Sequence, residues 1–278
     1  MFEFFANIFG YALNFIYNIV NNYGIAIIIF TIILKAIMIP MNLKQQKTMK
    51  KSAKIQVKSK EIQEKYGNDP VRMNQELMDL YKAENMSPFS GCLSSIIQFI
   101  VIISIFFVVS RPLTFMKHID SDTINKYTQE ITENNDNQRK NYMEIAIIRE
   151  KAQQDENVNL NMNFLGLDLS DIPIENLSNW KVYIIPVLYV ITSFISMKIT
   201  SNMNGMNKKE ENKVEQKTDD GKEEIAMEEM NKTMARMAPI MSVSISMIAP
   251  LGLALYWFVS NILMIIERAI TSKYLKEE

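Results

Sequence analysis

The sequence is poor in the residues that build disulfides, metal centres and hydrolytic sites. Its 278 residues include one cysteine, Cys92, and one histidine, His118. A single cysteine excludes an internal disulfide framework and a cysteine-based zinc site. A single histidine argues against a Ser-His-Asp triad and against a histidine-rich metal site. The eight glycines are scattered and form no phosphate-binding loop. We therefore expect a protein that is not an enzyme, with no catalytic residue, no cofactor and no metal.

The chain also lacks an excess of charge of either sign. The formal net charge is -1, which gives no reason to expect a direct nucleic-acid partner. Charged residues make up 22% of the chain, but they are crowded into blocks separated by long apolar runs. This distribution indicates membrane spans joined by polar loops, although the average composition would suit a soluble protein.

Long apolar runs are the dominant feature of what is present. A helix needs about 20 mostly apolar residues to cross roughly 30 Å of hydrocarbon. The last run, 238–266, is too long for one span, and Pro250 and Gly252 near its middle favour two. The pattern predicts five transmembrane helices, at 23–43, 88–110, 181–200, 236–249 and 251–270.

The first 22 residues predict an amphipathic helix lying at the membrane interface. The segment has no basic residue before its apolar part and no small-residue cleavage site, so it is a poor signal peptide. Its apolar residues recur at helical spacing, with asparagines mostly elsewhere around the helix. A sixth span is the alternative interpretation of residues 1–22.

The lysines and arginines near the spans predict the orientation. They place the N-terminus outside, the C-terminus in the cytosol, and an acid-rich loop, 111–180, outside the membrane. The cytosolic parts are then a helical hairpin at 44–87, a charged loop at 201–235 and a tail at 271–278. Within the hairpin we expect helices at 44–66 and 71–86, and within the outer loop a short helix around 141–153.

The first helix of this hairpin begins with a run of basic residues. Such residues attract anionic lipid headgroups by about 1 kcal/mol per cation near the surface. We expect this run to contact substrate or lipid, and an ordinary solvated face is the alternative. The residues concerned are Lys44, Lys47, Lys50, Lys51 and Lys54.

Lys35 is the most informative single residue, because it lies inside the first predicted span. It precedes Lys44 by nine residues, which is about 14 Å along a helix. A charge at this depth costs at least about 2.5–3.5 kcal/mol on insertion scales, and such residues usually face a cavity or a partner. The alternative is snorkelling, in which the aliphatic stem carries the ammonium to the interface.

Polar residues in the other spans predict surroundings for Lys35. Thr31 is four residues before it and shares its helix face. Each hydroxyl alone is weak support, because serine and threonine in spans often bond their own backbone or join helices. Together they predict a shared hydrated cavity that would receive an anionic ligand or an acidic polypeptide. The remaining candidates are Ser94, Gln98, Thr192, Ser196 and Ser242.

Several motifs resemble one family of membrane proteins. SPFSGCLSSIIQ (87–98) resembles the NPxxGCLPxxxQ signature that opens the second span of the YidC/Oxa/Alb membrane-protein insertases. TIILKAIMIPMNLKQQKTMKK, YGNDPVRMNQELMDLYK and APLGLALYWFVSN resemble further segments of the family, in the same order. SRPLTFM and NFLGLDLS look like the Gram-positive-type members.

The resemblance implies a groove that is open to the cytosol and the lipid but closed outside. A basic residue in it receives acidic residues of an incoming segment, without nucleotide hydrolysis. Lys35 occupies that position, where many bacterial members have arginine, and lysine lacks the planar bidentate geometry. Gln98 matches a groove-lining glutamine. Ser94 departs from the family, which usually has proline there.

These observations together predict an all-α polytopic membrane protein with five transmembrane helices around a polar groove. The resemblance implies an insertase and chaperone of the bacterial plasma membrane, working alone or with the Sec translocon. Its expected partners are nascent membrane proteins with short acidic tails, the lipid bilayer and the ribosome. The alternatives are a small anion transporter or channel, and a structural assembly subunit of a membrane complex.

Overall fold

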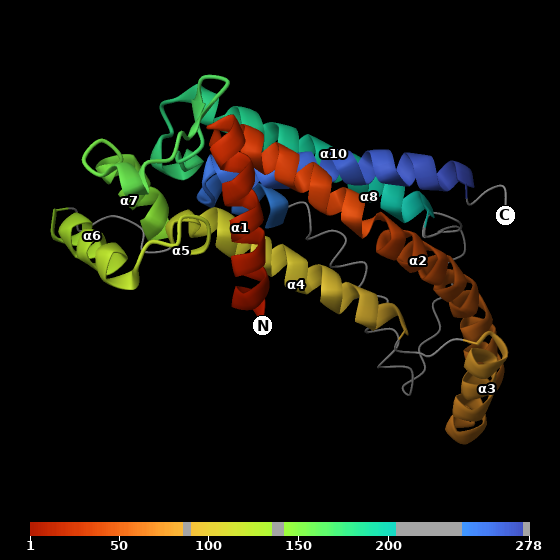
Figure 1. Cartoon of the computed structure of the whole chain (residues 1–278). Coiled ribbons are helices and arrows are strands. Elements are labelled where there is room, and N and C mark those ends of the chain that lie inside the picture. Colours follow the sequence, from red (N-terminus) through yellow and green to blue (C-terminus); the bar gives the residue numbers. More distant parts are fainter. Residues whose placement is uncertain (86–89, 135–141, 204–240, 275–278) are drawn as a thin grey trace. The chain divides into compact units, whose positions relative to one another are not determined.

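The computed structural model describes residues 1–85, 90–134, 142–203 and 241–274, and most of them are helical (Figure 1). The one strand pairing in these residues is a short antiparallel hairpin, β1 with β2. The expectation of a predominantly helical protein is confirmed. The elements are α1 (Phe2–Val20), α2 (Tyr23–Tyr66), α3 (Pro70–Ala83), α4 (Ser90–Ser110), α5 (Pro112–Phe115), α6 (Ser121–Asn134), α7 (Met143–Lys151), η2 (Glu156–Val158), β1 (Asn163–Phe164), β2 (Leu167–Asp168), η3 (Pro173–Glu175), η4 (Trp180–Tyr183), α8 (Ile184–Met203) and α10 (Leu251–Tyr274).

Among the described residues, three helices are long and apolar enough to cross a membrane. They are Tyr23–Thr48, Trp180–Thr200 and Leu251–Thr271, close to three of the predicted spans. In α4 the described apolar part is the shorter run Ile96–Ser110. Of the predicted span 236–249, residues 236–240 lie outside the described part, and residues 241–248 are helical. The count of five therefore stays a prediction.

The chain divides into two compact units. The first unit comprises Met1–Ile37, Gln98–Ser193 and Met241–Met264. The second unit comprises Met38–Ile97, Phe194–Ile240 and Ile265–Glu278. The helices α2, α4, α8 and α10 each contribute residues to both.

Helix α1 packs closely on α5 within the first unit. A Cβ atom built on Gly10 would lie 1.8 Å from the carbonyl oxygen of Phe115, so only glycine permits this approach. The rings of Tyr11 and His118 stack with their centroids 4.0 Å apart. The hydroxyl of Ser104 in α4 donates to the carbonyl of Phe2. Helix α1 is thus fixed to the rest of the unit along one face.

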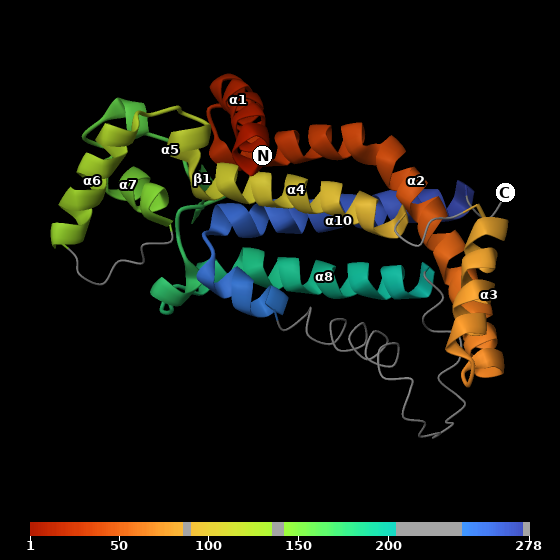
Figure 2. The same ribbon diagram turned by 90° about the horizontal axis from the view of Figure 1, so that it is seen from below.

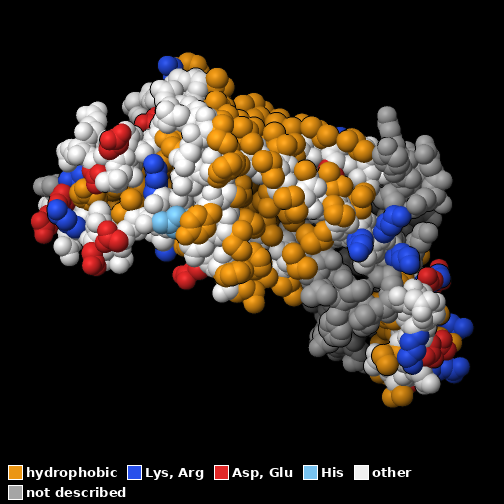
Figure 3. All heavy atoms as spheres, viewed as in Figure 1, with side chains coloured by type: hydrophobic (Ala, Val, Ile, Leu, Met, Phe, Trp, Pro, Cys, Tyr) orange, Lys and Arg blue, Asp and Glu red, His pale blue; other side chains and the backbone are white. Residues whose placement is uncertain are grey.

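Helix α1 also carries an exposed apolar stripe, of which Tyr11 is the member that stacks on His118. Its residues recur every three or four positions and are between 48% and 69% exposed. Figure 3 shows hydrophobic side chains gathered over α1 and the first part of α2. A helix that packs on one face and exposes apolar side chains on another has the form that an interfacial helix requires. The stripe consists of Phe4, Ile8, Tyr11, Phe15 and Ile19.

The segment between α4 and α8 is a folded region with its own polar contacts. Glu144 of α7 is 6% exposed and accepts hydrogen bonds from the backbone N–H and the hydroxyl of Thr114. Burial raises the pKa of Glu144, although these hydrogen bonds favour its ionised form. Helix α7 spans Met143–Lys151, close to the helix expected around 141–153.

The loop that follows β2 holds the start of α10. The backbone N–H of Leu251 donates to the carbonyl of Asp171, and that of Gly252 donates to the carbonyl of Leu169, both at 2.9 Å. The amides of a helix's first turn have no partner within the helix. The loop therefore supplies the acceptors that this helix start needs, where the sequence places Pro250.

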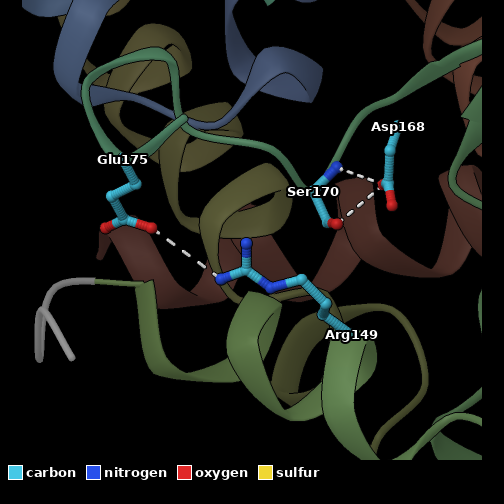
Figure 4. Close-up of polar contacts among 4 residues, drawn as sticks. All are labelled: Arg149, Asp168, Ser170 and Glu175. Carbon is cyan, nitrogen blue, oxygen red and sulfur yellow. Dashed lines mark hydrogen bonds and ion pairs between the residues drawn. The ribbon is translucent and has the colours of Figure 1, made fainter. Parts of the chain in front are cut away.

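Polar side chains also fasten this loop (Figure 4). Both the N–H and the hydroxyl of Ser170 donate to Asp168, at 2.9 and 2.7 Å. Arg149 of α7 lies 3.8 Å from the carboxylate of Glu175 in η3. The loop that caps α10 is in this way joined to α7.

In the second unit, α2 continues without a break to Tyr66. Residues 44–66, predicted as the first helix of the hairpin, continue the helix that begins at Tyr23. This helix has 44 residues and includes Pro40. Asp69 caps α3 by accepting from the backbone N–H of Arg72 at 3.1 Å. An ion pair between Lys58 and Glu84 joins the two arms of the hairpin, and α3 lies along the end of α2 (Figures 1 and 2).

Candidate functional site

The predicted groove residues fall in both units. Thr31 and Lys35 of α2, Gln98 of α4, Thr192 of α8 and Ser242 belong to the first unit, on four helical segments. Ser196 belongs to the second unit. The side chain of Ser94 lies outside the described residues. The site can therefore be built from five of the seven predicted residues.

The two α2 residues differ in exposure. Thr31 is fully buried, and its hydroxyl donates to the carbonyl of Ile27 at 2.6 Å. Lys35 lies one turn further along the helix and is partly exposed. In this conformation Lys35 is accessible from outside the protein, whereas the oxygen of Thr31 is not.

The hydroxyls of α8 and of residues 241–248 are used within the first unit. Thr192 donates to the carbonyls of Leu188 and Tyr189, both at 2.9 Å. The hydroxyl oxygens of Ser193 and Ser242 lie 3.4 Å apart and join the two segments. A hydroxyl whose proton is donated to the backbone keeps lone pairs that can accept a further hydrogen bond. The oxygens of these hydroxyls can therefore still accept from a peptide N–H.

Sequence reasoning missed Ser193. A helical spacing of four residues relates Thr192 to Ser196 on one face and leaves Ser193 out. Ser193 follows Thr192 directly, and its partner lies 49 residues away. Only the packing of two segments brings such a pair together.

A second polar cluster lies in the second unit, where α2, α8 and α10 carry polar residues toward the ends of their apolar stretches. The amide of Asn42 donates to the carboxylate of Glu267 at 3.1 Å. Arg268 donates to the carbonyl of Ser196 at 3.3 Å. The other carboxylate oxygen of Glu267 and the amide oxygen of Gln46 are buried, and neither accepts a hydrogen bond from the described part of the chain.

The sequence offered a partial signal for this cluster. Glu267 falls near the end of the predicted span 251–270, and Asn42 and Gln46 share a helix face through their spacing of four residues. Nothing in the spacing joins α2 to α10. The structure places Ser196 in this cluster, where its carbonyl accepts from Arg268.

The candidate hairpin lysines lie on the second half of α2. Lys44, Lys47 and Lys51 are exposed. The side chains of Lys50 and Lys54 lie outside the described ones. Exposure of this kind suits lipid contact, substrate contact and a solvated face equally, so these alternatives stay open.

Carboxylates of the region between α4 and α8 stabilise its fold. The backbone N–H of Asn157 and the hydroxyl of Tyr127 hold the pKa of Asp155 below its ordinary value. The ammonium of Lys151, which donates to Glu130 at 2.6 Å, lowers the pKa of that glutamate. Among the described residues, no group of three or more His, Cys, Asp or Glu side chains could hold a metal ion.

The outer faces of the spanning helices are apolar. On α2 and α8 large aliphatic and aromatic side chains are exposed at repeated helical spacing, which is the surface expected where a helix meets lipid. These side chains are Ile25, Ile32, Ile33 and Ile37 of α2, and Val187, Leu188, Ile191, Phe194 and Ile195 of α8.

Comparison with known proteins identifies the family. A family model described as 60Kd inner membrane protein matches residues 15–278. A Geobacter metallireducens protein named membrane protein insertase YidC is 27% identical over 263 residues, which cover 95% of this chain and 36% of that protein. A Syntrophus aciditrophicus protein of the same name is 48% identical over 104 residues, covering 37% of this chain and 18% of its own length.

A third protein of this name, from Caldanaerobacter subterraneus, is 39% identical over 97 residues, covering 35% of this chain and 47% of its own length. The chain thus spans about a third of the length of the Geobacter relative that it matches almost throughout. The family model covers most of the chain, and the motifs that it shares with the YidC/Oxa/Alb insertases occur in the same order. The protein therefore belongs to the 60Kd inner membrane protein family, that of the YidC insertases.

Proposed function

We propose that this protein is a membrane protein insertase of the bacterial plasma membrane, and that Lys35 is the cation that docks acidic tails of its substrates. The observation that carries the proposal is the position of Lys35. It lies inside the apolar segment Tyr23–Thr48, yet its side chain is partly exposed. Membership of the family, and relatives named as membrane protein insertases, support the same function.

The chemistry of docking is electrostatic attraction. A carboxylate 4 Å from an ammonium gains about 4 kcal/mol at an effective dielectric constant of about 20, which is enough to bias the path of a short tail. Lysine keeps its charge only where water or a counter-charge reaches it, because desolvation favours the neutral amine. The groove around Lys35 must therefore be hydrated when a substrate enters.

The other candidates would solvate the polar backbone of the tail. Gln98 offers both donors and acceptors, and the oxygens of Thr192 and Ser242 offer acceptors. Their presence in the same compact unit as Lys35 supports this role. Ser94, Thr31 and Ser196 remain sequence-based members of the proposed groove, with Thr31 buried in the present conformation.

The rest of the molecule fits a membrane setting. We propose that the apolar faces of α2 and α8 meet lipid, and that the exposed stripe of α1 lies in the interface. In the orientation proposed from loop charges, the N-terminus is outside and the hairpin formed by the end of α2 and by α3 is cytosolic. Its lysines would receive substrates, ribosomes or anionic lipid, and the Sec translocon is a proposed partner.

Insertion into reconstituted vesicles tests the docking role of Lys35. The reporter is a single-span protein with a short acidic N-terminal tail, and a neutral-tailed version of the same reporter is the control. Lys35→Ala should strongly reduce insertion of the acidic-tailed reporter, while Lys35→Arg should preserve it. Lys126→Ala, which removes an exposed lysine outside the apolar segment and outside the hairpin, is the matched control.

Two outcomes would contradict the proposal. If Lys35→Ala inserts the acidic-tailed reporter as well as the unmodified protein does, Lys35 is not the docking charge. If the vesicles conduct anions and insert neither reporter, the protein is a transporter or channel. Binding of nascent chains without transfer of their tails would instead indicate an assembly subunit.

A further inference from the structure

The turn between β1 and β2 has an unusual residue at its tip. Leu165 and Gly166 both adopt left-handed backbone conformations, with φ of 53° and 80°. A two-residue hairpin turn of this kind favours Asn-Gly or Asp-Gly, and a leucine at positive φ is disfavoured. Leu165 is also 87% exposed. Neither the backbone nor packing within the described chain accounts for leucine here.

The hairpin is fixed beside the start of α2. The backbone N–H of Tyr23 donates to the carbonyl of Asn161 at 3.0 Å, and the side chain of Asn22 donates to the carbonyl of Asn163 at 2.7 Å. The ring of Phe164 lies against Gly24, where a Cβ atom would come within 2.6 Å of it. Since Tyr23 begins the apolar segment Tyr23–Thr48, the hairpin lies at the level where that span meets its interface.

The start of α8 carries exposed apolar residues as well. Trp180 is 69% exposed and is the first residue of the candidate span Trp180–Thr200, and Leu177 just before it is 62% exposed. Figures 1 and 2 show the segment between α7 and α8 beside the N-terminal ends of α2 and α8. Tryptophan is enriched at the level where spans meet the membrane–water interface.

We propose that Leu165, Leu177 and Trp180 form an interfacial anchor that inserts into the lipid bilayer at the face from which α2 and α8 start. Lipid is the occupant favoured by continuity, because exposed Ile25 on α2 and Val187 on α8 extend the same apolar surface into the spans. The stretch NMNFLGL around the tip carries no charge. Three side chains are also too few for a standard protein–protein interface.

The anchor would fix the height of the hairpin, and through it the start of α2, relative to the bilayer. It rests on α2 and α8 crossing a membrane, and not on insertase activity or on Lys35. Its test uses no substrate. A failed insertion assay and a failed anchor are therefore separate results.

A fluorescent label at the tip tests the anchor directly. In the full chain, with Cys92 replaced by serine, the variant Leu165→Cys is labelled with the polarity-sensitive fluorophore NBD and reconstituted into phosphatidylcholine and phosphatidylglycerol vesicles. The matched control is Gln153→Cys, an exposed polar position in the same unit. The label at 165 should emit at shorter wavelength than that at 153. It should be quenched by lipids spin-labelled near the headgroup, and be shielded from aqueous iodide.

Trp180 gives an independent reading. The chain has two tryptophans, so Trp257→Phe leaves Trp180 as the single fluorescent one. Lipids brominated near the headgroup should quench its emission more strongly than lipids brominated near the chain ends.

Three results would overturn the proposal. The first is quenching of the label at 165 by iodide as strong as at 153. The second is shielding of that label from both iodide and spin-labelled lipid, which would indicate that protein, and not lipid, surrounds Leu165. The third is Trp180 emission unaffected by brominated lipid.

Discussion

Gly10 of α1 and Phe115 of α5 are in backbone contact, so close that a Cβ atom on Gly10 would lie 1.8 Å from the Phe115 carbonyl oxygen. This contact joins the exposed apolar stripe of α1 to the region between α4 and α8. Because the obstacle is backbone, a side-chain rotation cannot relieve it. The position of α1 therefore requires a residue without a Cβ atom at position 10.

Gly10→Ala should separate α1 from α5. Overpacking a close contact costs about 1–3 kcal/mol, occasionally more, and here the loss should lie at the upper end because the clash is with backbone. Thermal unfolding in detergent, read by circular dichroism, measures the shift. Ala12→Ser, at an exposed position of the same helix, should change the midpoint little. Equal midpoints for Gly10→Ala and the unmodified protein would refute the contact.

Glu144 should make stability depend on pH. Burial raises its pKa, so the folded protein holds this proton more tightly than the unfolded chain does. Its contribution to stability is present below the ordinary glutamate pKa and is lost as pH rises through the higher folded value. The free energy of unfolding, measured with denaturant between mildly acidic and neutral pH, should fall in that window. Glu144→Gln should flatten the slope, since an uncharged amide does not titrate; an unchanged slope would assign the effect to other groups.

The bond between Asn42 and Glu267 should appear as coupling in a double-mutant cycle. Asn42→Leu removes the donor at 3.1 Å and leaves a carboxylate whose other oxygen already accepts nothing from the described chain. A buried polar group left unsatisfied costs about 1–3 kcal/mol. Adding Glu267→Leu should recover part of that loss, because no carboxylate is then left behind. Strictly additive unfolding free energies for the two changes would show that the residues do not interact.

Gln98→Leu should reduce insertion of an acidic-tailed reporter, because the amide would no longer solvate the tail. Its neighbour Phe99 is 60% exposed, so Phe99→Leu keeps an apolar, accessible side chain and is the matched control. The readout is the ratio of insertion for acidic-tailed and neutral-tailed reporters in vesicles. If both variants lower the two reporters alike, Gln98 supports the fold and does not line the path of the tail.

The sequence predicted the three long spans well, and boundaries within helices poorly. Hydropathy falls sharply after residue 43, and a boundary was placed there. Helix α2 nevertheless continues to Tyr66, because the residues beyond are mostly good helix formers with no glycine or proline before Gly67. Leaving the membrane changes which side chains are favoured without interrupting backbone hydrogen bonds. A change in polarity along the sequence therefore marks the end of an apolar segment and does not mark the end of a helix.

The sequence predicted the types of residue in the candidate site, but it did not predict which of them contact one another. Helical spacing placed Thr31 on the same face as Lys35, but spacing cannot say which residues of a face are covered, and Thr31 is buried. Ser193 and Asn42 gained significance only through partners on other helices, at separations of 49 and 225 residues. Such contacts depend on tertiary packing, which a local sequence pattern does not reveal.

The capping of α10 has a consequence for the order in which the chain acquires its structure. The amides of Leu251 and Gly252 are held by carbonyls of Asp171 and Leu169, which precede them by about 80 residues. During synthesis those acceptors leave the ribosome before α10 does, so α10 depends on a loop that is made earlier. A fault in the loop after β2 would thus become apparent only later, when the start of α10 finds no acceptors for its amides.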